Sequence, residues 1–278
     1  MKKIVIGLII ILIIIVIYLY LEVTTLEVSQ YNVKSDKLPG AFDGYKIAHI
    51  SDFHNTKSNR LKNKILQTLE MDKPDILVIT GDFIDSRRTN MQVSLAFIEK
   101  IKNIPIYYVA GNHESRIKDY PKFKKELQNL GVKVLENEKI ELKQKTDIIS
   151  LIGLQDPSFD TSERDKKGMT QLVDKWLKTY STKDNFEILL LHRPELFTTY
   201  VENHVDVVFS GHAHGGQVVL PFIGPIIAPN QGYFPKYTSG VHTKDNTNLV
   251  ISRGIGNSLC PIRINNNPEL IYVILNKN

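Results

Sequence analysis

Strand-like and helix-like patterns of apolar residues alternate along most of the chain. Residues 75–80, DILVIT, form a continuous apolar run of the length expected for a buried strand. Residues 61–71, LKNKILQTLEM, instead place apolar side chains three and four positions apart, as an amphipathic helix does. This order predicts an α/β fold. Other strand-like runs lie at 45–51, 104–110, 132–135, 147–154, 186–191, 205–210, 247–254 and 269–275, and other helical patterns at 93–101, 123–130 and 169–180.

The N-terminus departs from this alternation. Residues 4–21, IVIGLIIILIIIVIYLYL, carry no charge and, at about 18 residues, reach the lower limit for crossing a bilayer. Lys2 and Lys3 precede the run, whereas Glu22 and Glu27 follow it, so the positive-inside bias predicts a cytoplasmic N-terminus and an extracytoplasmic remainder. No small-residue cleavage pattern follows the run, which favours an uncleaved anchor; the alternative is a protein secreted after cleavage.

The remainder reads as one globular unit. The chain has 278 residues, of which 42% are hydrophobic and 23% charged, enough for a substantial core. We find no internal repeat and no long linker. We therefore expect a membrane anchor over residues 1–24, a connecting segment over 25–44 and a single domain over 45–278.

Charge and cysteine content limit the partners and the kinds of metal site that we expect. The formal net charge of +5 comes from lysines scattered among acids, without the dense basic block of a dedicated nucleic-acid binder, so we expect no specific nucleic-acid binding. Cys260 is the single cysteine, which excludes an internal disulfide and a cysteine-based zinc site. Nitrogen and oxygen atoms must therefore hold any bound metal.

Polar side chains that can bind metals follow five of the predicted strands. Each one alone has an ordinary explanation as a turn residue or helix cap. Their repetition at five strand ends favours a single site, because strand carboxyl ends are where α/β proteins gather ligands. His49 lies inside an apolar strand and is expected to pack instead. The five blocks are SDFH at 51–54, GDFID at 81–85, GNHE at 111–114, LHRPE at 191–195 and GHAHGG at 211–216.

The blocks resemble, in order, the five motifs D-x-H, G-D, G-N-H-[ED], H and G-H-x-H of the calcineurin-like metallophosphoesterase family. They span residues 52–214, and the downstream stretches at 211–240 and 252–258 resemble a membrane-associated bacterial branch of that family. The resemblance implies a four-layer αββα sandwich that follows an N-terminal transmembrane helix. It also implies an enzyme that hydrolyses phosphate esters with two divalent metal ions, for which this ligand chemistry suits Mn, Zn or Fe.

The family pattern further implies a role for each site residue. Asp82 would bridge the two ions, and the non-ligand His113 would stabilise charge or protonate the leaving group as a catalytic residue. Glu114 would orient groups behind the ligands, or act as a turn acid bonded to backbone. Apart from the family pattern, Arg193 could contact a phosphate or be a solvated or ion-paired side chain. Asp156 could approach the cleft to support ligands or substrate, but a turn role before Pro157 is favoured. The remaining expected ligands are Asp52, His54 and His214 for the first ion, and Asn112, His192 and His212 for the second.

The resulting hypothesis is a membrane-anchored phosphoesterase that cleaves a phosphodiester or pyrophosphate with metal-activated hydroxide. The anchor and the apolar stretch VVLPFIGPIIAP suggest a lipid-linked or cell-envelope phosphate ester as substrate. The main alternative is a non-catalytic metal-binding scaffold on the same fold; the anchor and the lack of a basic tract argue against a nuclease. The sequence leaves the substrate, the native metals and the oligomeric state open.

Overall fold

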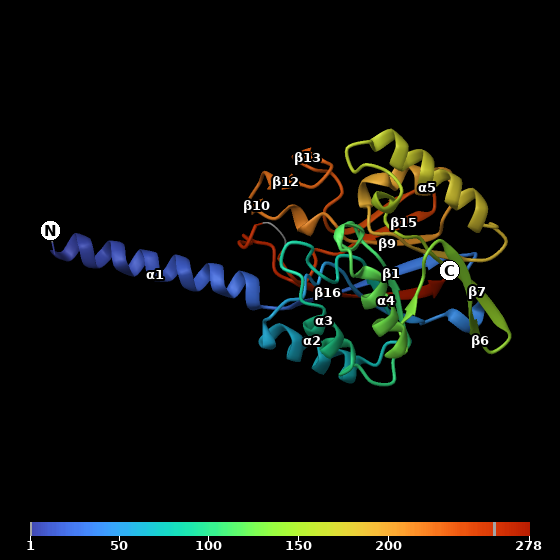
Figure 1. Cartoon of the computed structure of the whole chain (residues 1–278), viewed down its shortest axis with the longest axis horizontal. Helices are drawn as coiled ribbons and strands as arrows, with labels where there is room; N and C mark the ends of the chain where they lie inside the picture. The colour runs from blue at the N-terminus through green and yellow to red at the C-terminus, as the bar shows by residue number, and fades with distance from the viewer. Residues whose placement is uncertain (1, 258–259) are drawn as a thin grey trace.

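Two six-stranded mixed sheets pack face to face in this computed structural model, which describes residues 2–257 and 260–278 (Figure 1). The first sheet has the order β1 (Glu27–Ser35), β16 (Glu269–Lys277), β2 (Lys46–Ile50), β3 (Ile76–Thr80), β4 (Ile106–Val109) and β5 (Lys133–Val134). The second has the order β14 (Gly240–Lys244), β15 (Thr247–Ile251), β9 (Val207–Ser210), β8 (Glu187–Leu190), β7 (Asp147–Gly153) and β6 (Glu138–Gln144).

Helices cover the outer face of each sheet, which gives the predicted αββα layering. The first sheet packs against α2 (Asn59–Asp72), α3 (Met91–Ile98) and α4 (Tyr120–Asn129). The second packs against α5 (Lys166–Tyr180) and α6 (Phe197–Glu202), and α5 lies on the opposite side of the molecule from α2 and α3 in Figure 1. Short 3₁₀ helices occupy Gly40–Phe42, Glu114–Arg116, Pro157–Phe159, Pro194–Leu196 and His214–Gly216.

Alternation along the strands builds three separate apolar cores. In β2, Ile47 belongs to the core between the two sheets, whereas its neighbour Ala48 belongs to the core beneath α2, α3 and α4. Val78 and Phe209 meet Ile47 in the central core from β3 and β9. Strands buried on both faces read as continuous apolar runs, which is why these strands were visible in the sequence.

The helix α2 shows how the local sequence sets an element's ends. The Ser58 hydroxyl oxygen accepts a hydrogen bond from the Leu61 N–H at 3.3 Å and caps the first turn. Leu61, Ile65 and Leu69 then bury one face of the helix against the sheet. Lys73 adopts a left-handed conformation, with φ of 45°, and ends the helix.

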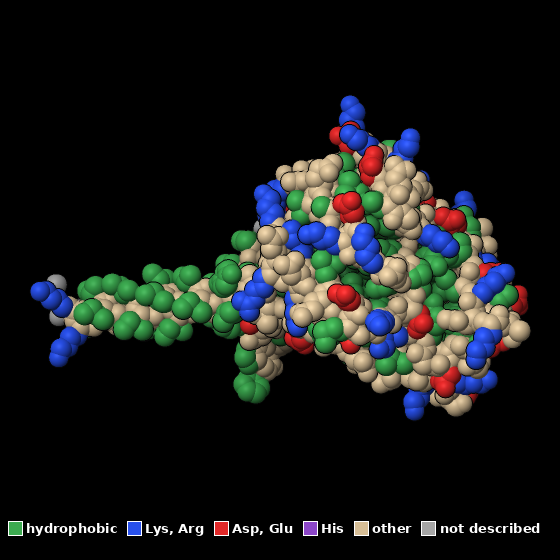
Figure 2. Space-filling model, turned by 90° about the horizontal axis from the view of Figure 1, so that it is seen from below, with side chains coloured by type: hydrophobic (Ala, Val, Ile, Leu, Met, Phe, Trp, Pro, Cys, Tyr) green, Lys and Arg blue, Asp and Glu red, His purple; other side chains and the backbone are tan. Residues whose placement is uncertain are grey.

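The apolar helix α1 (Lys2–Thr24) projects from the globular body as an isolated rod (Figures 1 and 2). Among the described residues it is the one helix long and apolar enough to cross a membrane, and its apolar window is 0% buried. Residues 25–44, expected as a connecting segment, contain β1, which pairs in parallel with β16 from Glu27↔Glu269 to Ser35↔Lys277. The segment is therefore part of the first sheet.

Candidate metal centre

The carboxyl ends of strands from both sheets meet at one place. Asp52 and His54 follow β2, Asp82 follows β3, and Asn112 and His113 follow β4. From the second sheet, His192 follows β8, and His212 and His214 follow β9. All eight side chains are buried. Some lie within ion-pair distance of one another, and others line the same cavity. The structure therefore brings together every residue that the sequence marked as a metal ligand, together with His113.

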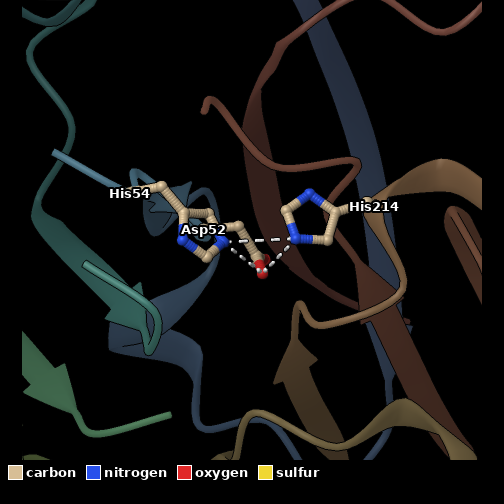
Figure 3. Close-up of side chains that lie close together, drawn as sticks. All are labelled: Asp52, His54 and His214. Atoms are coloured by element: carbon tan, nitrogen blue, oxygen red, sulfur yellow. Dashed lines mark hydrogen bonds and ion pairs between the residues drawn. The ribbon is translucent and has the colours of Figure 1, made fainter. Parts of the chain in front are cut away.

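Asp52, His54 and His214 form the first cluster, and their polar atoms point toward one another (Figure 3). Asp52 Oδ1 lies 3.3 Å from His214 Nε2 and 3.9 Å from His54 Nε2, and the two Nε2 atoms are 3.3 Å apart. Burial lowers the pKa of His214 and holds that of His54 well below its ordinary value, so both rings are neutral, as metal ligands must be.

Asp82, His192 and His212 form the second cluster. The Nδ1 of His192 donates a hydrogen bond to the Thr80 carbonyl oxygen at 2.6 Å, which turns its Nε2 toward Asp82 Oδ2, 3.4 Å away. The Nε2 of His212 is engaged by Arg193 Nη1 and Asn230 Oδ1, both at 3.0 Å, so its Nδ1 is the atom left for a metal.

The Asp82 carboxylate lies between the clusters. Its Oδ2 is 3.7 Å from His54 Nε2 in the first and 3.4 Å from His192 Nε2 in the second. Burial opposes ionisation of Asp82, but the adjacent His192 holds the pKa of Asp82 well below its ordinary value. The Asp82 Oδ1 accepts a hydrogen bond from the His113 N–H at 2.8 Å, which fixes the carboxylate with Oδ2 facing both clusters.

Several buried ligand atoms have no hydrogen-bond partner in the described part of the chain. They include Asp52 Oδ1, Asn112 Oδ1 and His192 Nε2. Buried polar atoms are almost always paired, because an unpaired one forfeits its hydration. Asp52 Oδ1 and Asn112 Oδ1 are acceptors that a cation would satisfy. Burial lowers the pKa of His192, but Asp82 and Asp52 raise it to about 10, and a cation would take the place of the proton on its Nε2. The residues present therefore fit divalent metals bound by imidazole, carboxylate and amide groups.

His113 is oriented as a proton donor. The Ser86 N–H donates to its Nδ1 at 3.0 Å, so the proton of the neutral ring resides on Nε2. That Nε2 lies 3.9 Å from Asp82 Oδ2, and the residue lines the cavity beside the clusters. The ring can therefore present an N–H to a substrate oxygen.

Glu114 joins the turns that follow β3 and β4. Its carboxylate accepts hydrogen bonds from the backbone N–H groups of Asp82 (2.9 Å), Phe83 (2.8 Å), Ile84 (3.0 Å) and Gly111 (2.8 Å). Burial and the nearby Asp82 raise the pKa of Glu114 to about 7, against the opposing effect of these donors. Its contacts are with backbone that carries metal ligands.

Arg193 and Asp156 form a fully buried pair beside the second cluster. Arg193 Nε and Nη2 donate to Asp156 Oδ2 and Oδ1 at 2.6 and 2.9 Å, while Arg193 Nη1 contacts His212 Nε2. Neither residue lines the cavity. Of the two roles that the sequence left open, these contacts match support of a ligand rather than contact with substrate.

Comparisons with known proteins agree with this geometry. The family model described as calcineurin-like phosphoesterase matches residues 45–216. The chain belongs to the calcineurin-like phosphoesterase family. It is therefore a hydrolase of phosphoester bonds, with buried His/Asp metal-binding clusters.

The similarity of this phosphoesterase to known relatives extends over most of its chain. It is 30% identical to the metallophosphoesterase YkuE of Bacillus subtilis, over 92% of this chain and 87% of that protein. It is 27% identical to a transmembrane protein with metallophosphoesterase domain from Bos taurus, over 91% of this chain and 56% of that protein. A dimetal phosphatase from Danio rerio shares the fold at 12% identity, with a TM-score of 0.50 over 77% of this chain and 88% of that chain.

A cavity of about 310 Å³ opens beside the metal clusters of the phosphoesterase. It is lined by Asp82, His212 and His214 and by Arg87 and Arg116, of which Arg116 is ion-paired with Glu163, another lining residue. Such a lining suits an anion that rests on metal ions. The other wall is largely apolar and comprises Ala213, Ile227, Ala228 and Pro229.

Some residues at the site were missed in the sequence. Asp85 Oδ2 lies 3.9 Å from His54 Nδ1 and accepts a hydrogen bond from Arg88 Nη2 at 2.7 Å. Its position as the last residue of the block GDFID could have marked it as a residue of the site. Asn230, which contacts His212, lies outside the five blocks, although the stretch 211–240 that contains it resembles the family.

Proposed function

We propose that the chain is a membrane-anchored phosphoesterase that hydrolyses a phosphodiester or pyrophosphate with two divalent ions, which are Mn, Zn or Fe. One observation carries this proposal: Asp82 Oδ2 lies between His54 Nε2 and His192 Nε2. These two imidazoles belong to separate clusters. In this assignment Asp82 would help to hold both ions. Asp52, His54 and His214 complete the first coordination shell, and Asn112, His192 and His212 the second.

The ions supply charge neutralisation for the phosphoryl group and a water of lowered pKa. Every other contribution comes from the chain. His113 Nε2 donates its proton to the departing oxygen, since Ser86 holds the proton on that nitrogen. Glu114 keeps the Asp82 turn in place through its four backbone contacts, and Arg193 holds the His212 ring. Arg87 adds positive charge at the cavity, where the anionic substrate would enter.

We assign residues 1–24 to a single-pass anchor, with the N-terminus in the cytoplasm and the domain of residues 45–278, completed by β1, outside. The isolated apolar rod of α1 supports the anchor. Lys2 and Lys3 at its start, with Glu22 at its end, support the orientation. The apolar wall at Ile227–Pro229 supports a substrate with a lipid or other apolar group attached to the phosphate.

Metal analysis and hydrolysis of bis(p-nitrophenyl) phosphate by the full chain test the reaction. Wild type is expected to hold two ions and to cleave the ester, whereas Asp82→Asn is expected to lose most activity and some metal. Asp174→Asn, a half-buried carboxylate on α5 that is paired with Lys178 and lies outside the cavity lining, is the matched control and should behave as wild type. Equal rates for wild type and Asp82→Asn would overturn the assignment of Asp82. Bound metal with no hydrolysis would favour a scaffold.

A further inference from the structure

Exposed apolar side chains gather on two small hairpins that follow the second metal cluster. The hairpins are β10–β11 (Val219–Leu220 and Gly224–Pro225) and β12–β13 (Ile227–Ala228 and Gly232–Tyr233). Outside α1, the described residues include ten exposed large hydrophobic side chains, and six of them lie on these hairpins. We call these six the hairpin patch: Leu220, Phe222, Ile223, Ile227, Tyr233 and Phe234.

Backbone hydrogen bonds hold the two hairpins that carry the patch together. The Ile226 N–H donates to the Val218 carbonyl oxygen at 3.0 Å, and the Phe234 N–H donates to the Ile226 carbonyl oxygen at 2.9 Å. These bonds tie the second hairpin and the residue after it to the start of the first. Apolar patches of this kind on a soluble surface mark interaction sites, because exposed apolar area is costly in water.

Phe222 is the most exposed member of the patch. Its side chain is 110% exposed relative to an extended chain, and its backbone adopts a φ of +66°, which bulky side chains rarely occupy. The turn thus projects an aromatic ring fully into the surroundings at a cost in backbone strain. Folding alone gives no benefit from that placement, so the benefit must come from something the ring contacts.

The hairpin patch lies at the end of the body from which α1 projects. The hydroxyl of Tyr18 in α1 donates to Asn265 Oδ1 at 3.1 Å, and Asn265 Nδ2 donates to the carbonyl oxygen of Val219 in β10 at 3.0 Å. Figure 1 shows β10, β12 and β13 on the α1 side of the body, and Figure 2 shows hydrophobic side chains projecting beside the base of α1. A bilayer that holds α1 up to Tyr18 therefore meets the first hairpin.

We propose that the hairpin patch docks into the outer leaflet of the bilayer that holds α1, which gives the domain a second membrane contact and a fixed orientation. This inference rests on the proposed anchoring by α1. Aromatic and aliphatic side chains at the end of a membrane-spanning helix are suited to the interfacial region. Ile227 belongs both to the patch and to the cavity wall, so the docked surface continues into the metal site. A lipid phosphodiester would then reach the metals along that wall.

Tryptophan fluorescence of the full chain in lipid nanodiscs tests the docking. Trp176, the single native tryptophan, is first replaced in Trp176→Phe. One probe is then introduced at a time: Phe222→Trp in the patch, Ile11→Trp in α1, and Met71→Trp as a matched exposed control near the end of α2. Phosphatidylcholine brominated along its acyl chains quenches any tryptophan that enters the bilayer. Retained hydrolysis of bis(p-nitrophenyl) phosphate reports that each variant is folded.

We expect strong quenching at position 11, partial quenching with blue-shifted emission at position 222, and neither effect at position 71. Quenching at 11 with a water-exposed, unquenched probe at 222 overturns the docking and leaves the anchor intact. No quenching at 11 overturns the anchor and, with it, the docking. Blue-shifted but unquenched emission at 222 that depends on the number of chains per nanodisc means that a second copy covers the patch, which also overturns the proposal.

Discussion

Asn266 is hydrogen-bonded to the backbone of His214. Its Nδ2 donates to the His214 carbonyl oxygen at 2.7 Å and to the Gln217 carbonyl oxygen at 3.2 Å. Its own N–H donates to Glu22 Oε2, at the end of α1, at 3.0 Å. A Cβ on Gly215 would lie 2.0 Å from Asn266 Oδ1, so glycine lets the two segments approach. Asn266 thus links the end of α1, through its backbone, to the loop that carries a metal ligand, through its side chain.

Asn266→Asp is expected to weaken binding of the first metal ion by about tenfold to a hundredfold, as loss of ligand support does elsewhere. The replacement keeps the shape of the side chain but removes the Nδ2 donor. Titration of metal against a chelator that competes for it measures the effect. Asn246→Asp, in the turn between β14 and β15, is the control. An affinity equal to that of wild type would show that His214 needs no support from Asn266.

His113→Asn is expected to slow hydrolysis by about a hundredfold or more for esters with poor leaving groups, and much less for p-nitrophenyl esters. The reason is that a poor leaving group must be protonated as it departs, and the Nε2 proton of His113 supplies that proton. Rates for a series of aryl phosphodiesters would show a steeper dependence on leaving-group pKa in the variant. Metal content should not change. A uniform loss across the series would argue against proton donation.

Asp156→Ala is expected to lower the free energy of unfolding by about 3–5 kcal/mol, because it leaves the buried Arg193 guanidinium without its carboxylate. Replacing both residues, in Asp156→Leu with Arg193→Met, is expected to recover much of that loss. Denaturant unfolding of the single and double variants measures both quantities. The double variant should still bind the second ion more weakly, since His212 Nε2 has lost its Arg193 contact. Additive losses of stability would contradict the pairing.

His49 makes the protein less stable in mild acid. Burial lowers its pKa to about 3 from an ordinary 6.5, and its Nε2 lies 2.7 Å from Thr80 Oγ1. Below pH 6.5 the unfolded chain therefore gains a proton that the folded chain does not bind. The free energy of unfolding is therefore unaffected by His49 above pH 6.5. It falls as the pH drops toward 3, by up to about 1.4 kcal/mol per pH unit. His49→Gln should remove this part of the slope, measured by urea unfolding between pH 7 and pH 5.

The strands that carry the metal ligands were predictable because both of their faces are buried. Within DILVIT, Ile76–Thr80 form β3 with every residue buried, and Asp82 follows the end of this strand at the site. By contrast, EVSQYNVKS at 27–35 reads as a polar connection, yet it forms β1. Only Val33 of that strand is buried, and its pairing partner, β16, comes more than 230 residues later. Local pattern carries no signal for a strand stabilised by so distant a neighbour.

The sequence likewise predicted which residues are candidate ligands, but it did not predict their backbone conformations. Asp52, Asp82 and His214 have φ values of 50°, 49° and 47°, a region that side chains other than glycine seldom adopt. Contacts from other segments fix these angles; the His212 N–H, for example, donates to Asp52 Oδ2 at 3.0 Å. The ring nitrogen of His212 that faces the metals also depends on Arg193 and Asn230. Such contacts exist only in the folded protein.

The order of strands in the first sheet constrains when the domain can fold during synthesis. β16 lies between β1 and β2, so the earliest strand to be made has no neighbour in the sheet until the last one arrives. In the proposed topology, α1 enters the membrane first and the rest of the chain crosses after it. The sheet then closes only after residue 277 has left the ribosome and been translocated, so β1 waits unpaired beside the membrane throughout elongation.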